Sequence, residues 1–236
     1  MCARYTMRIA SEAMRTLFDV DEVPELEPRY NVAPTQDAPV VVEERDGTRS
    51  VRMMRWGLVP SWAKDPAIGQ RMINAKSETV FEKPAFREAV RRHRCLIPCD
   101  GFYEWKDVPI VAEGLFTDLE PTGKTRKQPY HVTVRGGCPF AMAGLFERWS
   151  DDGRRIETFT VLTCPPNPLV AQLHDRMPVI LHPRDYDLWL DPEVEDQAAL
   201  RSLFEPLEAS EMEIHPVNPL VGNPRFDSPD LLNAPS

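Results

Sequence analysis

The sequence predicts an α+β domain with a mostly antiparallel, barrel-like β core and short peripheral helices. Many short runs are rich in Val, Ile, Phe and Thr, a composition that favours strands. The helical patterns between these runs are short, and 24 prolines among 236 residues interrupt the chain too often for long helices. Because no repeat or change of composition divides the chain, we expect one domain over residues 1–236.

The N-terminal part predicts two helices and a hairpin. Ser11 can cap a short helix in which apolar residues follow Met14 at i+3 and i+4. The apolar runs at residues 40–44 and 51–56 flank an Asp-Gly turn, which predicts a β-hairpin. A second helix is expected over residues 84–94, with proline at its first position.

Strands dominate the middle of the chain. The expected strands lie at residues 95–99, 102–106, 130–134, 140–146 and 157–164, and the last two are joined across Asp151-Asp152-Gly153. Residues 107–128 lack periodicity and hold two prolines and two glycines. We therefore expect an irregular surface insertion there.

The C-terminal part predicts short elements and a tail. A short helix is expected after Asn167, with His174 at its C-terminal end, followed by a strand at residues 177–181. The further elements are helices near residues 184–190 and 195–204, a last strand at residues 213–217 and an irregular tail at residues 217–236.

The charges are unevenly distributed along the chain. The formal net charge of −9 argues against nucleic acid as a partner, because phosphate binding depends on Lys and Arg. Residues 71–94, however, hold seven basic and three acidic residues, whereas residues 185–213 hold ten carboxylates and one arginine. A basic face and an acidic periphery can therefore coexist, although a solvated helix face explains any single one of these charges as well.

The five cysteines are odd in number and widely spaced, which predicts reduced thiols. No second ligand pair completes a metal site with Cys95 and Cys99, so we expect no metal, and the sequence indicates no cofactor. No apolar run approaches the roughly 18 residues of a membrane span, and no secretory signal opens the chain. We expect a cytoplasmic protein, associated with the nucleoid in a bacterium, that does not bind membranes.

Three residues have the pattern of a chemical site. If Met1 is removed, Cys2 carries a free α-amine next to its thiol-bearing carbon. Glu104 interrupts an aromatic-rich strand, where burial would raise its pKa and suit it to proton transfer; exposure by strand alternation is the other reading. His174 at a helix end is either a catalyst or a residue that stabilises the helix terminus.

Six motifs follow one another along the chain. They are Cys2 with Arg4, RYNVAPT at 29–35, WGLVPSW at 56–62, INAKSET at 73–79, RCLIPCDGFYEW at 94–105 and LHDRMPVIL at 173–181. Together, and in this order, they resemble the SOS response-associated peptidase (SRAP) family. The sequence differs from the usual family pattern at Ala3, where glycine is common, and at Lys76, where arginine is common.

The resemblance implies a protein that crosslinks to abasic sites in single-stranded DNA through its mature N-terminal cysteine. It implies Cys2 as the nucleophile, Asn74 as a polar contact to the reacting centre, Glu104 as the proton-transfer residue and His174 as its acid-base partner. The DNA contacts that we predict are Arg4, Asn31, Trp62, Lys76 and Arg176. Trp56 and Trp105 are further candidates for stacking, with one of the three tryptophans expected to touch DNA. We expect a monomer.

Two other functions remain open from the sequence. An N-terminal nucleophile hydrolase also begins with Met-Cys, and the family name records a proposed peptidase activity, whose minimal form is self-removal of Met1. A non-catalytic DNA-binding module would use Cys2 only as a structural residue.

Overall fold

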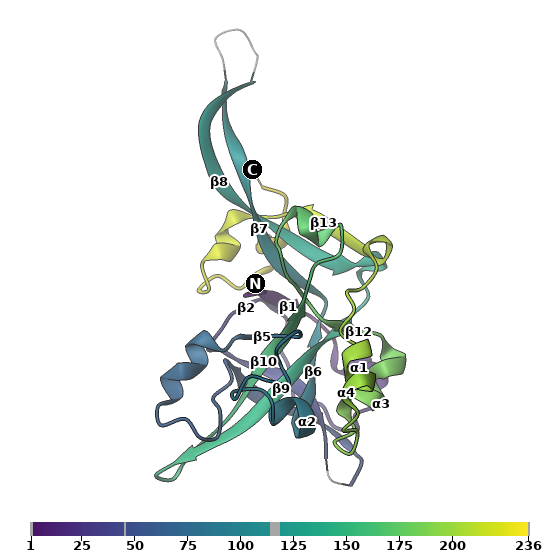
Figure 1. Cartoon of the computed structure of the whole chain (residues 1–236). Coiled ribbons are helices and arrows are strands. Elements are labelled where there is room, and N and C mark those ends of the chain that lie inside the picture. The colour runs from purple at the N-terminus through teal and green to yellow at the C-terminus, as the bar shows by residue number, and fades with distance from the viewer. Residues whose placement is uncertain (1, 45, 114–118, 236) are drawn as a thin grey trace.

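Two sheets and a few short helices build the protein, as a computed structural model that describes residues 2–44, 46–113 and 119–235 shows (Figure 1). In the described chain the first sheet has the order β13-β8-β7-β1-β2. Its strands are β1 (Tyr5–Met7), β2 (Arg29–Val32), β7 (Gly101–Glu113), β8 (Leu119–Val134) and β13 (Met212–Pro216). All the pairings in this sheet are antiparallel.

The second sheet has the order β11-β10-β4-β3-β6-β9-β12, and β5 also pairs with β10. Its strands are β3 (Asp37–Glu43), β4 (Arg49–Trp56), β5 (Asn74–Lys76), β6 (Arg94–Cys99), β9 (Phe140–Asp151), β10 (Arg154–Cys164), β11 (Met177–Pro178) and β12 (Ile180–Leu181). Strand β10 runs parallel to β4 and β5, while its other pairings are antiparallel. The predicted mostly antiparallel α+β fold is therefore confirmed.

The helices are short and peripheral, as the sequence predicts. They are α1 (Ser11–Phe18), α2 (Ala89–Arg92), α3 (Tyr186–Leu190) and α4 (Gln197–Ser202). The 3₁₀ helices are Pro66–Arg71, Arg135–Gly137, Val170–Gln172, Pro183–Asp185, Ala209–Glu211, Pro219–Gly222 and Pro229–Leu232. The helix expected after Asn167 is thus a single 3₁₀ turn.

Helix α2 is shorter than the predicted helix over residues 84–94. The chain leaves the helix because Arg94 already belongs to β6, where its side chain is buried. Its guanidinium donates to the carbonyl oxygens of Val90 and Trp189, which ties the end of α2 to α3. Burial lowers the pKa of Arg94 to about 10. The free-energy cost of burying its charge is offset by these charge-assisted hydrogen bonds.

The main hydrophobic core joins both sheets around a buried aromatic group. The Trp56 ring lies 5.3 Å from the Tyr5 ring and 6.1 Å from the Phe159 ring, between centroids. Tyr5 belongs to the first sheet, whereas Trp56 and Phe159 belong to the second, so this contact fixes β1 against the larger sheet. All three side chains are fully buried.

Residues 107–128 were expected to be an irregular insertion, and the structure corrects this prediction. Strands β7 and β8 continue through the described part of this segment as an antiparallel hairpin, which projects from the body of the molecule (Figure 1). The pairing register shifts between Pro109 and Val111, which is the kind of bulge where proline is tolerated in a strand. We call the part of this hairpin beyond Glu104 and Tyr130 the arm.

The C-terminal tail is mostly irregular, as predicted, but it packs closely on the first sheet. Val217, Val221 and Leu231 form a small core cluster with Tyr103. The tail thus covers one face of β7. Within the described residues, no helix is long and apolar enough to span a membrane.

Candidate active site

Strand pairing places Cys2 beside Glu104. Tyr5 on β1 pairs with Phe102 on β7. One residue closer to the N-terminus, the Arg4 carbonyl oxygen accepts a hydrogen bond from the Tyr103 N–H at 3.0 Å. Continued antiparallel pairing sets the segment that begins at Cys2 against Glu104 on β7. The negative charge of Glu104 is accordingly one of the causes that raise the pKa of the Cys2 thiol.

Asn74 on β5 holds the backbone of Cys2. Its Nδ2 donates to the Cys2 carbonyl oxygen at 2.8 Å, and Asn74 itself is fixed by the parallel pairing of β5 with Val161 on β10. The Oδ1 atom of Asn74 is buried and accepts no hydrogen bond from the described residues. The site therefore contains a buried acceptor next to the N-terminal segment.

Glu104 is buried, as one of the two readings of the sequence predicts. The side chain is 2% exposed, and burial raises its pKa to about 7, with a smaller contribution from the negative charge of Asp175. A carboxyl group with this pKa is present in both protonation states near neutrality. It can therefore donate and accept protons.

Cys2 is buried, although residues near chain termini are usually exposed. Cys2 is 0% exposed and belongs to the main core. Burial, followed by the charge of Glu104, raises the pKa of its thiol, and the Sγ atom donates weakly to the Arg4 carbonyl oxygen at 3.9 Å. The thiol is thus protonated at neutral pH in the chain that carries Met1. Asn74 and β7 hold the segment that begins at Cys2.

His174 follows the 3₁₀ turn Val170–Gln172, at the end of a helical turn as predicted. Its Nδ1 accepts the backbone N–H of Arg176 at 3.0 Å, and burial lowers its pKa. Both observations favour the neutral imidazole with the proton on Nε2. The Asp175 Oδ1 atom also lies 2.8 Å from Nδ1, a contact that becomes a favourable ion pair only when the ring is protonated.

Strand β10 brings these groups to one end of the second sheet. Asn74 and Lys76 on β5 pair with Val161 and Thr163, and Met177 on β11 pairs with Cys164. The segment that carries His174 therefore enters β11 beside the strand end that carries Lys76. The sequence did not predict that the charge of Asp175 raises the pKa of Glu104. Only its position next to His174 in the sequence could have indicated a place near the site.

Three of the predicted DNA contacts remain available to a ligand. Lys76 is exposed, and Trp62 is 59% exposed on the segment that follows β4. Arg4 is half-buried beside Cys2, where its Nη1 donates to the Ala3 carbonyl oxygen at 2.9 Å. Of the other two tryptophans, Trp56 is buried and Trp105 is partly buried against the tail cluster.

Two of the predicted DNA contacts are placed differently. Asn31 is fully buried, and its Nδ2 donates to the carbonyl oxygens of Val221, Asn223 and Phe226. It anchors the C-terminal tail, and its contact with DNA stays a prediction. The sequence around Asn31, a polar residue between Tyr30 and Val32, did not indicate that its side chain would anchor the tail.

Arg176 is also buried, and its guanidinium is engaged by protein groups. It forms a two-pronged ion pair with the Glu78 carboxylate and donates to the Thr163 carbonyl oxygen at 2.6 Å. This hydrogen bonding lowers the pKa of Glu78. The arrangement fits a structural ion pair that holds β10 and the segment after His174 together, and does not fit an exposed phosphate contact.

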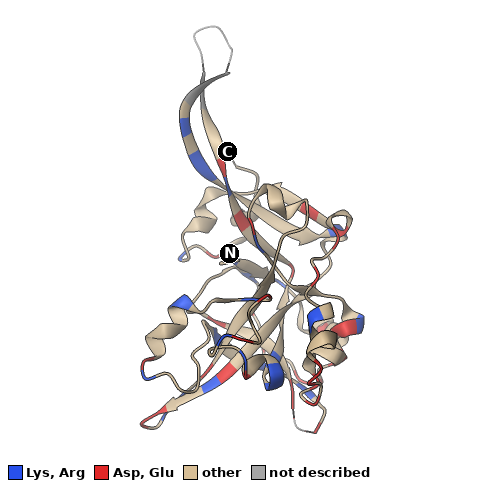
Figure 2. Cartoon of the chain, in the orientation of Figure 1, with Lys and Arg blue, Asp and Glu red and all other residues tan. Residues whose placement is uncertain are grey.

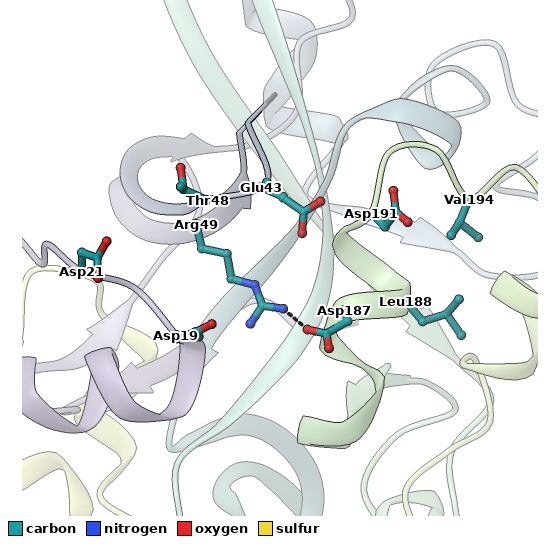
Figure 3. A pocket seen from close by; sticks show the side chains of 10 residues that line it. Asp19, Asp21, Glu43, Thr48, Arg49, Asp187, Leu188, Asp191 and Val194 are labelled. Atoms are coloured by element: carbon teal, nitrogen blue, oxygen red, sulfur yellow. Dashed lines mark hydrogen bonds and ion pairs between the residues drawn. The ribbon is translucent and has the colours of Figure 1, made fainter.

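A separate pocket lies between α1, β3, β4 and α3. Figure 3 shows the Arg49 guanidinium between the carboxylates of Asp19 and Asp187 there, with an ion pair to Asp187. None of the residues that line this pocket belongs to the group around Cys2. The described residues contain no cluster of three or more His, Cys, Asp and Glu side chains that could hold a metal ion.

The fold and the site define a protein with a mostly antiparallel β core, in which Cys2 lies between Asn74 and the strand that carries Glu104. The sequence profile of the SRAP family, SOS response associated peptidase, matches residues 1–224. The chain belongs to this family.

Curated relatives and a solved structure agree with this assignment. The chain is 39% identical to the "Abasic site processing protein YoqW" of Bacillus subtilis over 99% of this chain and 100% of that protein. It is 31% identical to the "Abasic site processing protein HMCES" of Xenopus tropicalis, over 88% of this chain and 66% of that protein. A crystal structure of a protein from Bacteroides thetaiotaomicron is similar with a TM-score of 0.82 and 26% identity, over 99% of both chains.

Proposed function

We propose that the protein processes abasic sites in single-stranded DNA by forming a covalent thiazolidine crosslink through Cys2 after Met1 is removed. The observation that carries this proposal is the convergence on Cys2 of two groups from different sheets. Asn74 donates to its carbonyl oxygen at 2.8 Å, and the buried Glu104 carboxyl beside it has a pKa of about 7. The names of the relatives, abasic site processing proteins, support the same substrate.

The chemistry uses both nucleophiles of a terminal cysteine. An abasic deoxyribose opens to an aldehyde, and the Cys2 α-amine adds to its carbon to give a carbinolamine, which loses water to form an imine. The thiol then adds to the imine carbon while its proton goes to nitrogen, which closes a five-membered ring. Aldehyde, amine and thiol thus yield thiazolidine and water. The second addition is intramolecular, where effective molarities reach about 10⁵ M or more.

Glu104 can move the protons of both steps. The protonated carboxyl donates to the departing hydroxyl group and recovers a proton from nitrogen as the imine forms. It then donates to the imine nitrogen and accepts the thiol proton as sulfur attacks, so the carboxyl ends as it began. A pKa of about 7 suits a group that must alternate between donor and acceptor near neutral pH. The neutral imidazole of His174 is proposed to orient or relay for Glu104.

Asn74 is suited to hold the reacting amine. In the processed chain its Nδ2 can keep the hydrogen bond to the Cys2 carbonyl oxygen, while the buried Oδ1 can accept an N–H of the new α-amine or a sugar hydroxyl. This would satisfy the buried acceptor and aim the amine lone pair at the sugar. An α-amine pKa of about 7.7 to 8.0 leaves a useful neutral fraction at pH 7.

The test combines intact-mass analysis with a denaturing gel. Purified protein should lack the mass of methionine, and incubation with an abasic oligonucleotide should add the mass of the oligonucleotide minus one water. Cys2→Ala should give no product that survives denaturation without a reductant, because an imine cannot close to a ring. Cys138→Ser, at an exposed cysteine, is the matched control and should crosslink like wild type.

The results also distinguish the other functions. Turnover of a peptide or glutamine substrate that survives excess abasic DNA would favour a hydrolase. Absence of any retained product with the processed wild-type protein would favour a non-catalytic binding module.

A further inference from the structure

The arm extends the strand that carries Glu104 away from the body of the molecule. In this antiparallel pair Glu104 lies opposite Tyr130, Lys106 opposite Gln128, and Val108 opposite Arg126. Because directly opposed residues share a face and alternate residues along a strand return to it, Lys106 and Arg126 lie on the face that carries Glu104. We call this the Glu104 face.

The opposite face of the same hairpin is neutralised or covered. Lys127 lies opposite Asp107, and its Nζ forms an ion pair with Asp107 Oδ2 at 2.8 Å. Closer to the body, Tyr103 and Trp105 on this face pack against the tail cluster. This face therefore has little charge to offer a ligand.

The Glu104 face of the arm is cationic and accessible. Lys106 and Arg126 are exposed, and neither forms an ion pair with a carboxylate among the residues that the structure describes. Figure 2 shows basic residues along the β8 side of the arm, in a molecule whose net charge is −9. Lys106 lies on the strand of Glu104 and Arg126 on the neighbouring strand β8, and neither side chain contributes to a core, so folding does not account for these exposed cations.

The geometry points to the arm as a phosphate-binding surface for the DNA strand that flanks the abasic nucleotide, an inference that rests on the proposed function. Val108, the partner of Arg126, lies four positions after Glu104, which is about 13 Å along a strand. At about 3.4 Å per stacked nucleotide this distance covers roughly four nucleotides. Lys106 and Arg126 would contact successive parts of one strand as it leaves the site.

The experiment compares two double variants of equal charge change. Lys106→Ala with Arg126→Ala removes the cations of the Glu104 face. Lys127→Ala with Arg135→Ala removes two cations that are paired with Asp107 and Glu213. Binding is measured as a function of salt with a 15-nucleotide single strand that has a central tetrahydrofuran analogue of the abasic site, which has no aldehyde and cannot crosslink, and with a trinucleotide that has the same centre. Crosslinking is measured separately with the natural abasic site in both oligonucleotides. Circular dichroism and melting temperature check that both variants fold.

The arm variant should lower the slope of log Kd against log salt by about 1.4 on the 15-mer, from two phosphate contacts at about 0.7 each. On the trinucleotide it should match wild type, because no flanking strand reaches the arm. The control should change neither slope by more than about half that amount.

The failure of this inference is distinguishable from failure of the proposed function. If wild type crosslinks both oligonucleotides, and the two double variants have equal slopes on the 15-mer, the arm does not bind the flanking strand. If wild type crosslinks neither oligonucleotide, the proposed function itself is wrong.

Discussion

The side chain of Asn74 fixes the backbone of Cys2, with 2.8 Å between Nδ2 and the carbonyl oxygen. The two residues lie 72 positions apart, and the contact links the second sheet to the start of the first. On the other side, β1 is paired with β7. A terminal segment that would otherwise fray is therefore held at two points, which fixes the position of the Cys2 backbone and thiol.

Asn74→Ala should slow crosslinking under single-turnover conditions by about 3- to 10-fold, the value of one net hydrogen bond of about 0.5 to 1.5 kcal/mol. The reason is that the Cys2 backbone loses its fixed position relative to Glu104. The measurement is the rate of product formation on denaturing gels at saturating protein. Asn223→Ala, at an exposed tail residue, is the control. An unchanged rate for Asn74→Ala would show that Asn74 does not position Cys2 for crosslinking.

Glu104→Gln should slow crosslinking by about 100-fold or more, because an amide cannot donate and then accept a proton. The pH dependence is the more specific test. Wild type should show a change of slope near pH 7, where Glu104 titrates, and the variant should lack it. Rates measured from pH 5.5 to 8.5 check this. Equal rates and equal profiles would assign the proton transfers to another group.

The same carboxyl group should make the folded state sensitive to pH. Burial raises the pKa of Glu104 to about 7, from an ordinary value of 4.5, so the folded state binds the proton more tightly than the unfolded state does. The stability from this proton is complete below the ordinary pKa and is lost as pH rises through 7. The loss amounts to roughly 3 kcal/mol.

Glu104→Gln, which stays neutral, should therefore melt at a higher temperature than wild type at pH 8, and the difference should shrink toward pH 5. Thermal melts by circular dichroism across this range measure it. Glu12→Gln, at an exposed position on α1, is the matched control for the change from carboxyl to amide. A difference that grows toward acid pH would reverse the sign and contradict the burial argument.

Local patterns predicted the elements whose determinants are local. The Asp-Gly turn between two apolar runs predicted the β3–β4 hairpin, and the apolar spacing after Ser11 predicted α1. The predicted cap is wrong, because Ala10 and not Ser11 is the N-cap residue and no side chain caps this helix. The arm was not predicted from local patterns, which indicated an irregular insertion in its place. Its proline at position 109 reads as a loop signal, whereas in the structure it sits at a bulge that the long pairing of β7 with β8 tolerates.

The site was predictable where the residue type is unusual for its place, and not where partners are distant. Glu104 stands out in an aromatic strand, which marked it as a candidate, while the choice between its burial and its exposure needed the structure. The use of Asn31 as an anchor depends on carbonyl oxygens about 190 or more positions away, at Val221, Asn223 and Phe226. A sequence window contains no information about such partners.

Arg176→Ala should reduce stability more than DNA affinity. The variant leaves Glu78 and the Thr163 carbonyl oxygen without their charged donor, a loss of about 2 kcal/mol, or roughly 5 °C in melting temperature. The slope of log Kd against log salt should stay within about 0.3 of wild type, since no phosphate contact is lost. Lys83→Ala, at an exposed basic residue, controls for the loss of charge. A full unit of slope lost with unchanged melting would restore Arg176 as a DNA contact.

Trp62→Ala should weaken binding of single-stranded DNA about tenfold without changing the melting temperature, because base stacking on an aromatic ring is worth about 1 to 3 kcal/mol. The ring is 59% exposed, so its removal opens no cavity in the core. Fluorescence anisotropy with an undamaged oligonucleotide isolates binding from crosslinking. Met53→Ala, at a residue 49% exposed, tests whether any apolar surface loss has the same effect. Trp62→Phe should recover most of the affinity, since it keeps a flat ring; equal weakening by the Ala and Phe variants would mean that stacking is not what Trp62 contributes.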